Sequence, residues 1–149
     1  MFDKFGEYDN VDEFNDSARK LISEPTSLRI LAEENGIDPE DVEDYMAGEM
    51  KDLADAASYA LGRIKVELEN TKIDRQAAEY IAAIARKVLT NGRKAHFKNR
   101  TFEAIMKAFE KKAKENNQVY ACGSDRDMEK IIEAYYFDSE EAMKKAVGI

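Results

Sequence analysis

The sequence has very little of the residues on which disulfide-bonded and metal-binding proteins depend. It contains no tryptophan, two prolines, one cysteine (Cys122) and one histidine (His96) among 149 residues. A single cysteine excludes an internal disulfide and favours a reducing compartment, so we expect a cytoplasmic protein. Because a zinc site normally takes three or four His, Cys or carboxylate ligands, Cys122 and His96 would need acidic helpers, and we expect neither a metal nor another cofactor.

Long apolar runs are missing too. No stretch of about 18 apolar residues is present, which predicts no transmembrane helix, and the acidic start MFDKFGEYDN lacks the apolar core of a signal peptide. Glycine-rich phosphate loops are also absent, since NGRK and ACGS are interpreted as turns. A Cys–His nucleophile pair is formally available, but no surrounding motif supports it. We therefore expect a protein that is not an enzyme.

Helical spacing of apolar residues runs through nearly the whole chain, without a convincing alternating strand pattern. This predicts an all-α fold, a single compact bundle of about six or seven helices covering residues 1–149. The longest predicted helix covers residues 42–68, with Gly48 and Gly62 on its outer side. A glycine inside a helix costs about 1 kcal/mol relative to alanine, so either glycine can mark a bend or a break. The predicted N-caps are Ser27, Asp38, Asp74, Thr101, Ser124 or Asp125, and Asp138 or Ser139.

The segment LAEENGIDPEDVEDYM, residues 31–46, has the pattern of a helix-turn-helix. Gly36 follows the first helix, and Asp38 and Pro39 are good residues to open the second. A DNA-reading helix places Arg, Lys, Asn or Gln at its N-terminal end. Here that end carries only acids: Glu40, Asp41, Glu43 and Asp44. We therefore expect a helical hairpin that packs inside the protein and whose outer surface avoids nucleic acid.

The net charge of −8 is unevenly distributed. Residues 1–62 hold 17 acids and 5 bases, whereas residues 63–149 hold 18 bases and 14 acids. Within the second part, residues 86–114 carry 10 bases against two acids. Such an asymmetry concerns the choice of partners rather than the fold, because opposite fields attract different molecules.

The acidic side of the predicted long helix is the first candidate surface. Residues 41–55 would span about 21 Å at the helical rise, a row of negative charge comparable in extent to several DNA phosphates. A protein that binds DNA through lysine and arginine could bind this row instead. The alternative is a solvated helix face whose first acids favour the helix dipole. The candidate contacts are Glu40, Asp41, Asp44, Asp52 and Asp55.

The basic loop NGRKAHFKNR, residues 91–100, is the second candidate surface. Basic residues interleaved with aromatic ones can hold a nucleic-acid backbone and stack a base. The alternative is an ordinary charged loop that pairs with the acidic half of the same chain. The candidate nucleic-acid contacts are Arg93, Lys94, His96, Phe97, Lys98 and Arg100.

A resemblance to a known family lies in residues 98–138, about a quarter of the chain. KNRTFEAIMKAFEKKAKENN is a basic and amide-containing start followed by an aromatic-bearing, lysine-rich helix pattern. ACGSDRDMEKIIEAYYFD then combines a short segment containing cysteine and acids with a helix pattern that ends in paired aromatics and an acid. This outline resembles the C-terminal region of the PcfK-like proteins of mobile elements.

The resemblance implies a function without catalytic residues. PcfK-like proteins are associated with plasmids, conjugative elements and phages, and some are anti-CRISPR inhibitors of an RNA-guided effector nuclease. Such a nuclease has positively charged channels for nucleic acid, which an acidic DNA mimic could occupy. The leading hypothesis is therefore an inhibitor that binds this nuclease through its acidic helix face. Whether the basic part also binds the guide RNA is left open by the sequence.

Two other functions remain open from the sequence. One is a nucleic-acid-binding accessory protein of a mobile element, which would use the basic loop. The other is a plain interaction module that docks a partner through apolar residues of the N-terminal arm, namely Phe2, Phe5 and Tyr8.

Overall fold

The computed structural model describes residues 8–115 and 124–149, in which every regular element is an α-helix. Predictions that involve Phe2, Phe5 and Cys122 lie outside these residues. The eight helices are α1 (Val11–Lys20), α2 (Pro25–Glu34), α3 (Pro39–Met46), α4 (Ala56–Asn70), α5 (Arg75–Leu89), α6 (Phe102–Glu115), α7 (Asp125–Phe137) and α8 (Glu140–Val147). The predicted all-α class is confirmed, with slightly more helices than expected.

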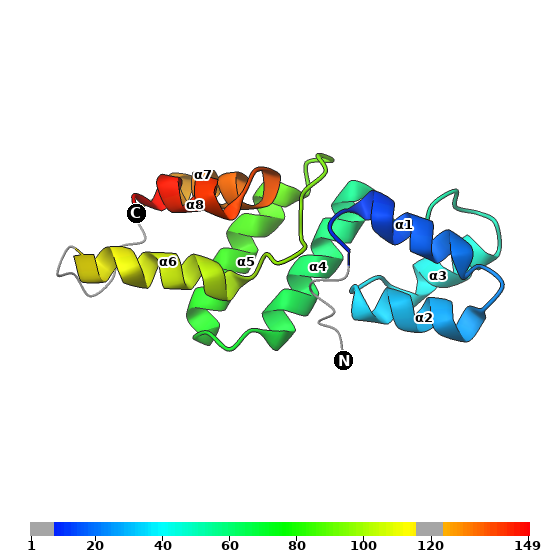
Figure 1. Cartoon of the computed structure of the whole chain (residues 1–149). Coiled ribbons are helices and arrows are strands. Elements are labelled where there is room, and N and C mark those ends of the chain that lie inside the picture. Colours follow the sequence, from blue (N-terminus) through cyan, green and yellow to red (C-terminus); the bar gives the residue numbers. More distant parts are fainter. Residues whose placement is uncertain (1–7, 116–123) are drawn as a thin grey trace.

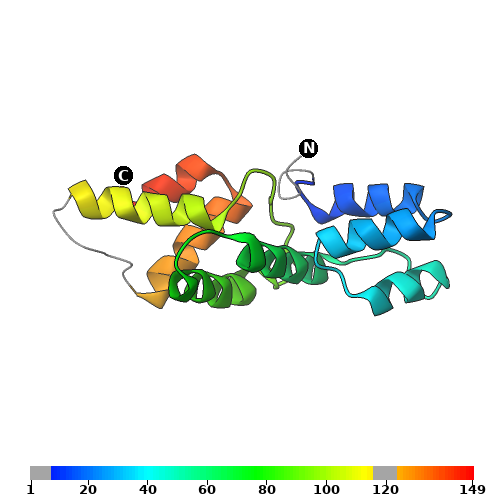
Figure 2. The ribbon, with the colours of Figure 1, turned by 90° about the horizontal axis from the view of Figure 1, so that it is seen from below.

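The helices follow one another from one end of the molecule to the other (Figures 1 and 2). Helices α1, α2 and α3 form one end, α4 and α5 form a helical hairpin in the middle, and α6, α7 and α8 form the other end. Helix α5 packs on both α4 and α7, which joins the middle to the C-terminal end. The acidic part of the sequence, residues 1–62, therefore includes α1, α2 and α3 at one end, and the more basic part includes α5 in the middle and α6, α7 and α8 at the other end.

A chain of aromatic side chains passes through the core and connects these parts. Neighbouring rings lie 5.0–6.1 Å apart between centroids, in tilted or edge-to-face arrangements that aromatic pairs prefer. Its members come from the N-terminal segment, α1, α4, the loop before α6, and α7. In order of contact they are Tyr8, Phe14, Tyr59, Phe97, Tyr136 and Tyr135.

The predicted long helix over residues 42–68 is wrong, because the chain leaves the helical path at Gly48. Helix α3 ends at Met46, and Gly48 has a φ of 81°, a left-handed conformation that glycine adopts without steric strain. Helix α4 begins afresh behind Asp55, whose carboxylate accepts a hydrogen bond from the Ser58 N–H in a capping box. The intervening apolar residue Leu53 is still buried, so the apolar pattern continues although the helix does not.

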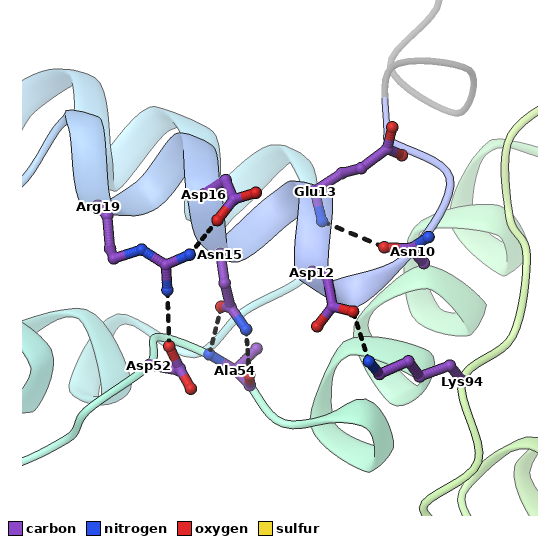
Figure 3. A network of polar contacts seen from close by, with 9 residues as sticks. All are labelled: Asn10, Asp12, Glu13, Asn15, Asp16, Arg19, Asp52, Ala54 and Lys94. Carbon is purple, nitrogen blue, oxygen red and sulfur yellow. Dashed lines mark hydrogen bonds and ion pairs between the residues drawn. The ribbon is translucent and has the colours of Figure 1, made fainter.

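Asn15 holds this non-helical segment against α1 (Figure 3). Its side-chain amide donates to the Ala54 carbonyl at 2.8 Å, and its Oδ1 accepts from the Ala54 N–H at 3.1 Å. Asn15 is buried, so both backbone groups of Ala54 are satisfied away from water. The pair fixes where α4 starts relative to α1.

Most predicted N-caps are confirmed, and one is wrong. Asp38, Asp74, Thr101, Ser124 and Ser139 each accept a hydrogen bond from a backbone N–H in the following turn. Ser27 does not cap α2, because that helix begins two residues earlier at Pro25. Proline suits the first helical position, where its missing N–H would have no helical partner.

Because tyrosines are buried in the core, we expect the protein to lose stability at alkaline pH. Burial raises the pKa of Tyr59 and Tyr136 above the ordinary value, mainly because the core disfavours the phenolate. Above about pH 10 the unfolded chain loses these protons while the folded chain keeps them, so the free energy of unfolding falls by up to about 1.4 kcal/mol per pH unit for each tyrosine. Urea denaturation between about pH 9 and about pH 11 measures this slope. The slope should be smaller in Tyr59→Phe, and an unchanged slope would contradict the assignment.

Candidate partner-binding surfaces

Three of the five candidate acidic residues lie on α3 and form what we call the α3 acidic surface: Glu40, Asp41 and Asp44. Glu40 and Asp44 are exposed and Asp41 is half-buried. None of the three carboxylates forms an ion pair with a residue in the described part of the chain. The carboxylate that caps the helix is that of Asp38, so none of these three carboxylates is used as the cap.

The other two candidate acids serve the fold instead. Asp52 accepts a hydrogen bond from Arg19 at 2.9 Å, and Arg19 also pairs with Asp16 (Figure 3). Asp55 accepts from the Ser58 N–H at 2.7 Å at the start of α4. Neither residue shares a helix with the α3 acidic surface, so the prediction of one continuous acidic row over residues 41–55 is wrong.

The basic loop is a structural connection between distant parts of the chain. The His96 N–H donates to the Tyr136 carbonyl at 2.7 Å, and the Phe97 N–H donates to the Asp9 carbonyl at 2.6 Å. The loop therefore hydrogen-bonds through its backbone to α7 on one side and to the segment before α1 on the other. The loop is therefore held on both sides and is not a free surface loop.

The candidate side chains of this loop are largely occupied within the protein. Lys94 pairs with Asp12 at 2.5 Å, as Figure 3 shows, and His96 Nδ1 lies 2.5 Å from a carboxylate oxygen of Asp9. The Arg93 guanidinium lies 4.0 Å from the centroid of the Phe137 ring. These contacts support the alternative in which the loop pairs with the acidic half of the same chain.

Two further candidates, Phe97 and Arg100, are held by the C-terminal end of the core. Phe97 is only 5% exposed and lies between Tyr59 and Tyr136, so its ring faces protein rather than solvent. Arg100 donates to backbone carbonyl oxygens, with distances of 3.0–3.2 Å, on Lys98, Tyr135 and Asp138. The side chain of Lys98 itself is exposed and forms no ion pair with a described residue.

A buried polar network on α4 was not anticipated from the sequence. Arg63 donates to the Asn35 side-chain oxygen at 3.2 Å, and Glu67, one helical turn later, accepts from the Phe102 N–H at 2.7 Å. The network ties α4 to the end of α2 and to the start of α6. The sequence feature that could have indicated these contacts is a pair of charged residues, Arg63 and Glu67, placed four residues apart within an apolar stripe.

A groove opens between α2, α3 and α4, with a volume of about 580 Å³. We call it the α2–α4 groove. Its floor contains the apolar residues Ile37, Val42 and Val66, and its edges carry charged side chains from all three helices. The sequence did not predict it, because α4 reaches this place only through the tertiary fold.

Neither a metal centre nor a membrane-spanning helix is found in the described residues. Residues 8–115 and 124–149 contain no group of three or more His, Cys, Asp or Glu side chains placed to hold a metal ion. Over the same residues, no helix is both long and apolar enough to cross a bilayer.

Comparisons with known proteins identify no relative of this chain. No known protein family matches the chain, and neither a curated protein nor a solved structure shows significant similarity to it.

Proposed function

We propose that this protein is a non-enzymatic inhibitor that binds a CRISPR RNA-guided effector nuclease and keeps DNA out of its positively charged channel. The observation that carries the proposal is the α3 acidic surface, whose three carboxylates form no ion pair with a described residue. Carboxylates on a rigid helix offer lysine and arginine side chains a substitute for phosphate groups.

The surroundings of the α3 acidic surface strengthen its negative field. Residues 1–62 carry 17 acids against 5 bases. Two of these bases pair with acids of the same part, Arg19 with Asp16 and Asp52 and Arg29 with Glu43, so the surplus of acids over bases is unchanged there. A surplus of one sign at one end of a molecule steers an oppositely charged partner to that end.

The class of partner comes from the resemblance to PcfK-like proteins, some of which inhibit such nucleases. An RNA-guided nuclease holds the guide–target duplex in a positively charged channel and reads a short flanking motif with arginines. The helix-turn-helix shape of α2 and α3 with acids on its second helix fits this role, because it repels DNA and attracts a DNA-binding surface.

The test is target-DNA cleavage by RNA-guided nucleases in the presence of the protein. The triple variant Glu40→Gln, Asp41→Asn, Asp44→Asn removes the three charges and leaves the contacts of the core in place. We expect the concentration for half-maximal inhibition to rise about tenfold, because exposed ion pairs contribute up to about 1 kcal/mol each and 1.4 kcal/mol is a factor of ten.

A matched control changes the net charge equally at the other end of the molecule. The control variant carries Glu110→Gln, Glu133→Gln and Glu141→Gln, three exposed residues on α6, α7 and α8. It should inhibit like the parent protein. Equal inhibition by both folded variants would remove the α3 acidic surface from the mechanism, and failure of the parent to inhibit any effector nuclease would remove the function.

A further inference from the structure

The α2–α4 groove has a preformed apolar floor. Ile37, Val42 and Val66 are 5%, 1% and 4% exposed, so they belong to the core and show only a small part of their surface to the groove. Ile37 is held in the turn between α2 and α3, where its N–H donates to the Ala32 carbonyl at 2.9 Å. Because the floor is part of the packed core, a ligand does not have to order it.

Two glycines, of which Gly36 lines the groove, bring the turn after α2 into contact with α4. A Cβ atom built on Gly36 would lie 2.3 Å from the Gly62 carbonyl oxygen, and one built on Gly62 would lie 2.3 Å from the Asn35 carbonyl oxygen. The turn after α2 therefore touches the backbone of α4 directly. This contact sets the distance between the walls that α2 and α4 contribute.

The edges of the groove carry negative charge that the fold leaves unneutralised. Glu33 on α2 and Glu69 on α4 both line the groove, both are exposed, and neither forms an ion pair with a described residue. Glu43 is already engaged, since it accepts from Arg29 Nε at 3.1 Å. The charged residues that line the groove are four acids and two bases, so acids outnumber bases; they are Glu33, Asp38, Glu43 and Glu69, and Arg29 and Lys65.

We propose that the α2–α4 groove receives an arginine side chain from the protein partner. The exposed side chain of Pro39, which also lines the groove, and the small exposed parts of the floor suit the aliphatic part of that side chain. The carboxylates of Glu33 and Glu69 suit its guanidinium group, which carries five donors in one plane. The groove lies in the end of the molecule that attracts positive charge. The assignment to one partner rests on the proposed function, because an RNA-guided nuclease reads its flanking motif with arginines.

The first experiment uses a capped Gly-Arg-Gly peptide as the probe and follows the backbone amides of the full chain by NMR. The peptide should shift the amides of Gly36, Ile37 and Val66. A Gly-norleucine-Gly peptide, which keeps the aliphatic part without the charge, should shift them much less. Shifts centred on another face, or no shifts at all, would overturn the proposal.

The second experiment compares two variants with the same change in net charge. Glu33→Gln with Glu69→Gln should weaken binding of the arginine peptide about tenfold, the loss of roughly two exposed ion pairs. Glu49→Gln with Glu133→Gln changes exposed residues that do not line the groove and should bind like the parent. Equal binding by the two variants would overturn the role of Glu33 and Glu69.

The two proposals fail separately. Peptide binding in the groove by a protein that inhibits no effector nuclease would retain the arginine site and remove the partner. Inhibition that persists without any peptide binding in the groove would retain the function and remove the site.

Discussion

Replacing Gly62 with alanine is expected to lower the free energy of unfolding by about 3 kcal/mol. The new methyl group would lie 2.3 Å from the Asn35 carbonyl oxygen and 3.0 Å from the Gly36 carbonyl oxygen. Real Cβ atoms do not come that close to backbone, so the turn after α2 and helix α4 would have to move apart. The sign of the stability change is informative, because replacing glycine with alanine at an uncrowded helix position stabilises a protein by about 1 kcal/mol.

Urea denaturation of the parent and of Gly62→Ala measures this effect. Gly48→Ala is the matched control, because a Cβ atom on Gly48 would meet nothing within 4 Å. Its φ of 81° still penalises alanine, by about 1–2 kcal/mol, because Cβ then crowds its own local backbone rather than another part of the fold. If Gly62→Ala were as stable as the parent or more so, α4 would not touch the α2–α3 turn as described.

Replacing Phe97 with alanine is expected to cost about 4 kcal/mol of stability, in the range for a large aromatic side chain lost from a core. Phe97 fills the space between Tyr59 and Tyr136, with ring centroids 5.6 Å away on both sides. A phenylalanine kept on the surface to stack a nucleic-acid base would cost little stability when removed. The measurement therefore separates a core residue from a nucleic-acid contact.

The neighbouring Lys98→Ala variant is the control for this prediction. Its side chain is exposed and forms no ion pair with a described residue, so the free energy of unfolding should change by less than about 0.5 kcal/mol. A Phe97→Ala protein as stable as Lys98→Ala would contradict the buried position of the loop. It would also restore the basic loop as a candidate surface for nucleic acid.

The acidic candidate residues show how much of a surface the local sequence pattern can predict. Glu40, Asp41 and Asp44 lie on one short helix, and the sequence placed them there because Asp38 and Pro39 are local start signals. Asp52 and Asp55 were assigned to the same face only because the apolar stripe continues through Leu53, which is buried without being helical. Buried apolar residues recur at a similar spacing whether the segment is helical or not. The spacing alone therefore does not reveal the break at Gly48.

The basic loop shows the opposite situation, in which the local pattern was clear and its interpretation depended on distant residues. Lys94 and His96 pair with Asp12 and Asp9, which lie 82 and 87 positions earlier in the chain. Pairing of the loop with acids of the same chain was one of the two interpretations of the sequence. No local feature of the sequence, however, distinguishes those two aspartates from the other acids among the 31 in the chain. Only the position of the loop between α7 and the segment before α1 decides it.

By itself, the sequence determined the all-α class, most helix starts, and the concentration of acids in the first part of the chain. These properties depend on hydrogen bonds and side-chain spacing within a few residues. The tertiary structure alone decided that Gly62 is a contact point inside α4, that Phe97 is buried, and that α2, α3 and α4 enclose a groove. The physical reason is that close packing and ion pairs form between residues far apart in the chain, where periodicity carries no information about which surfaces meet.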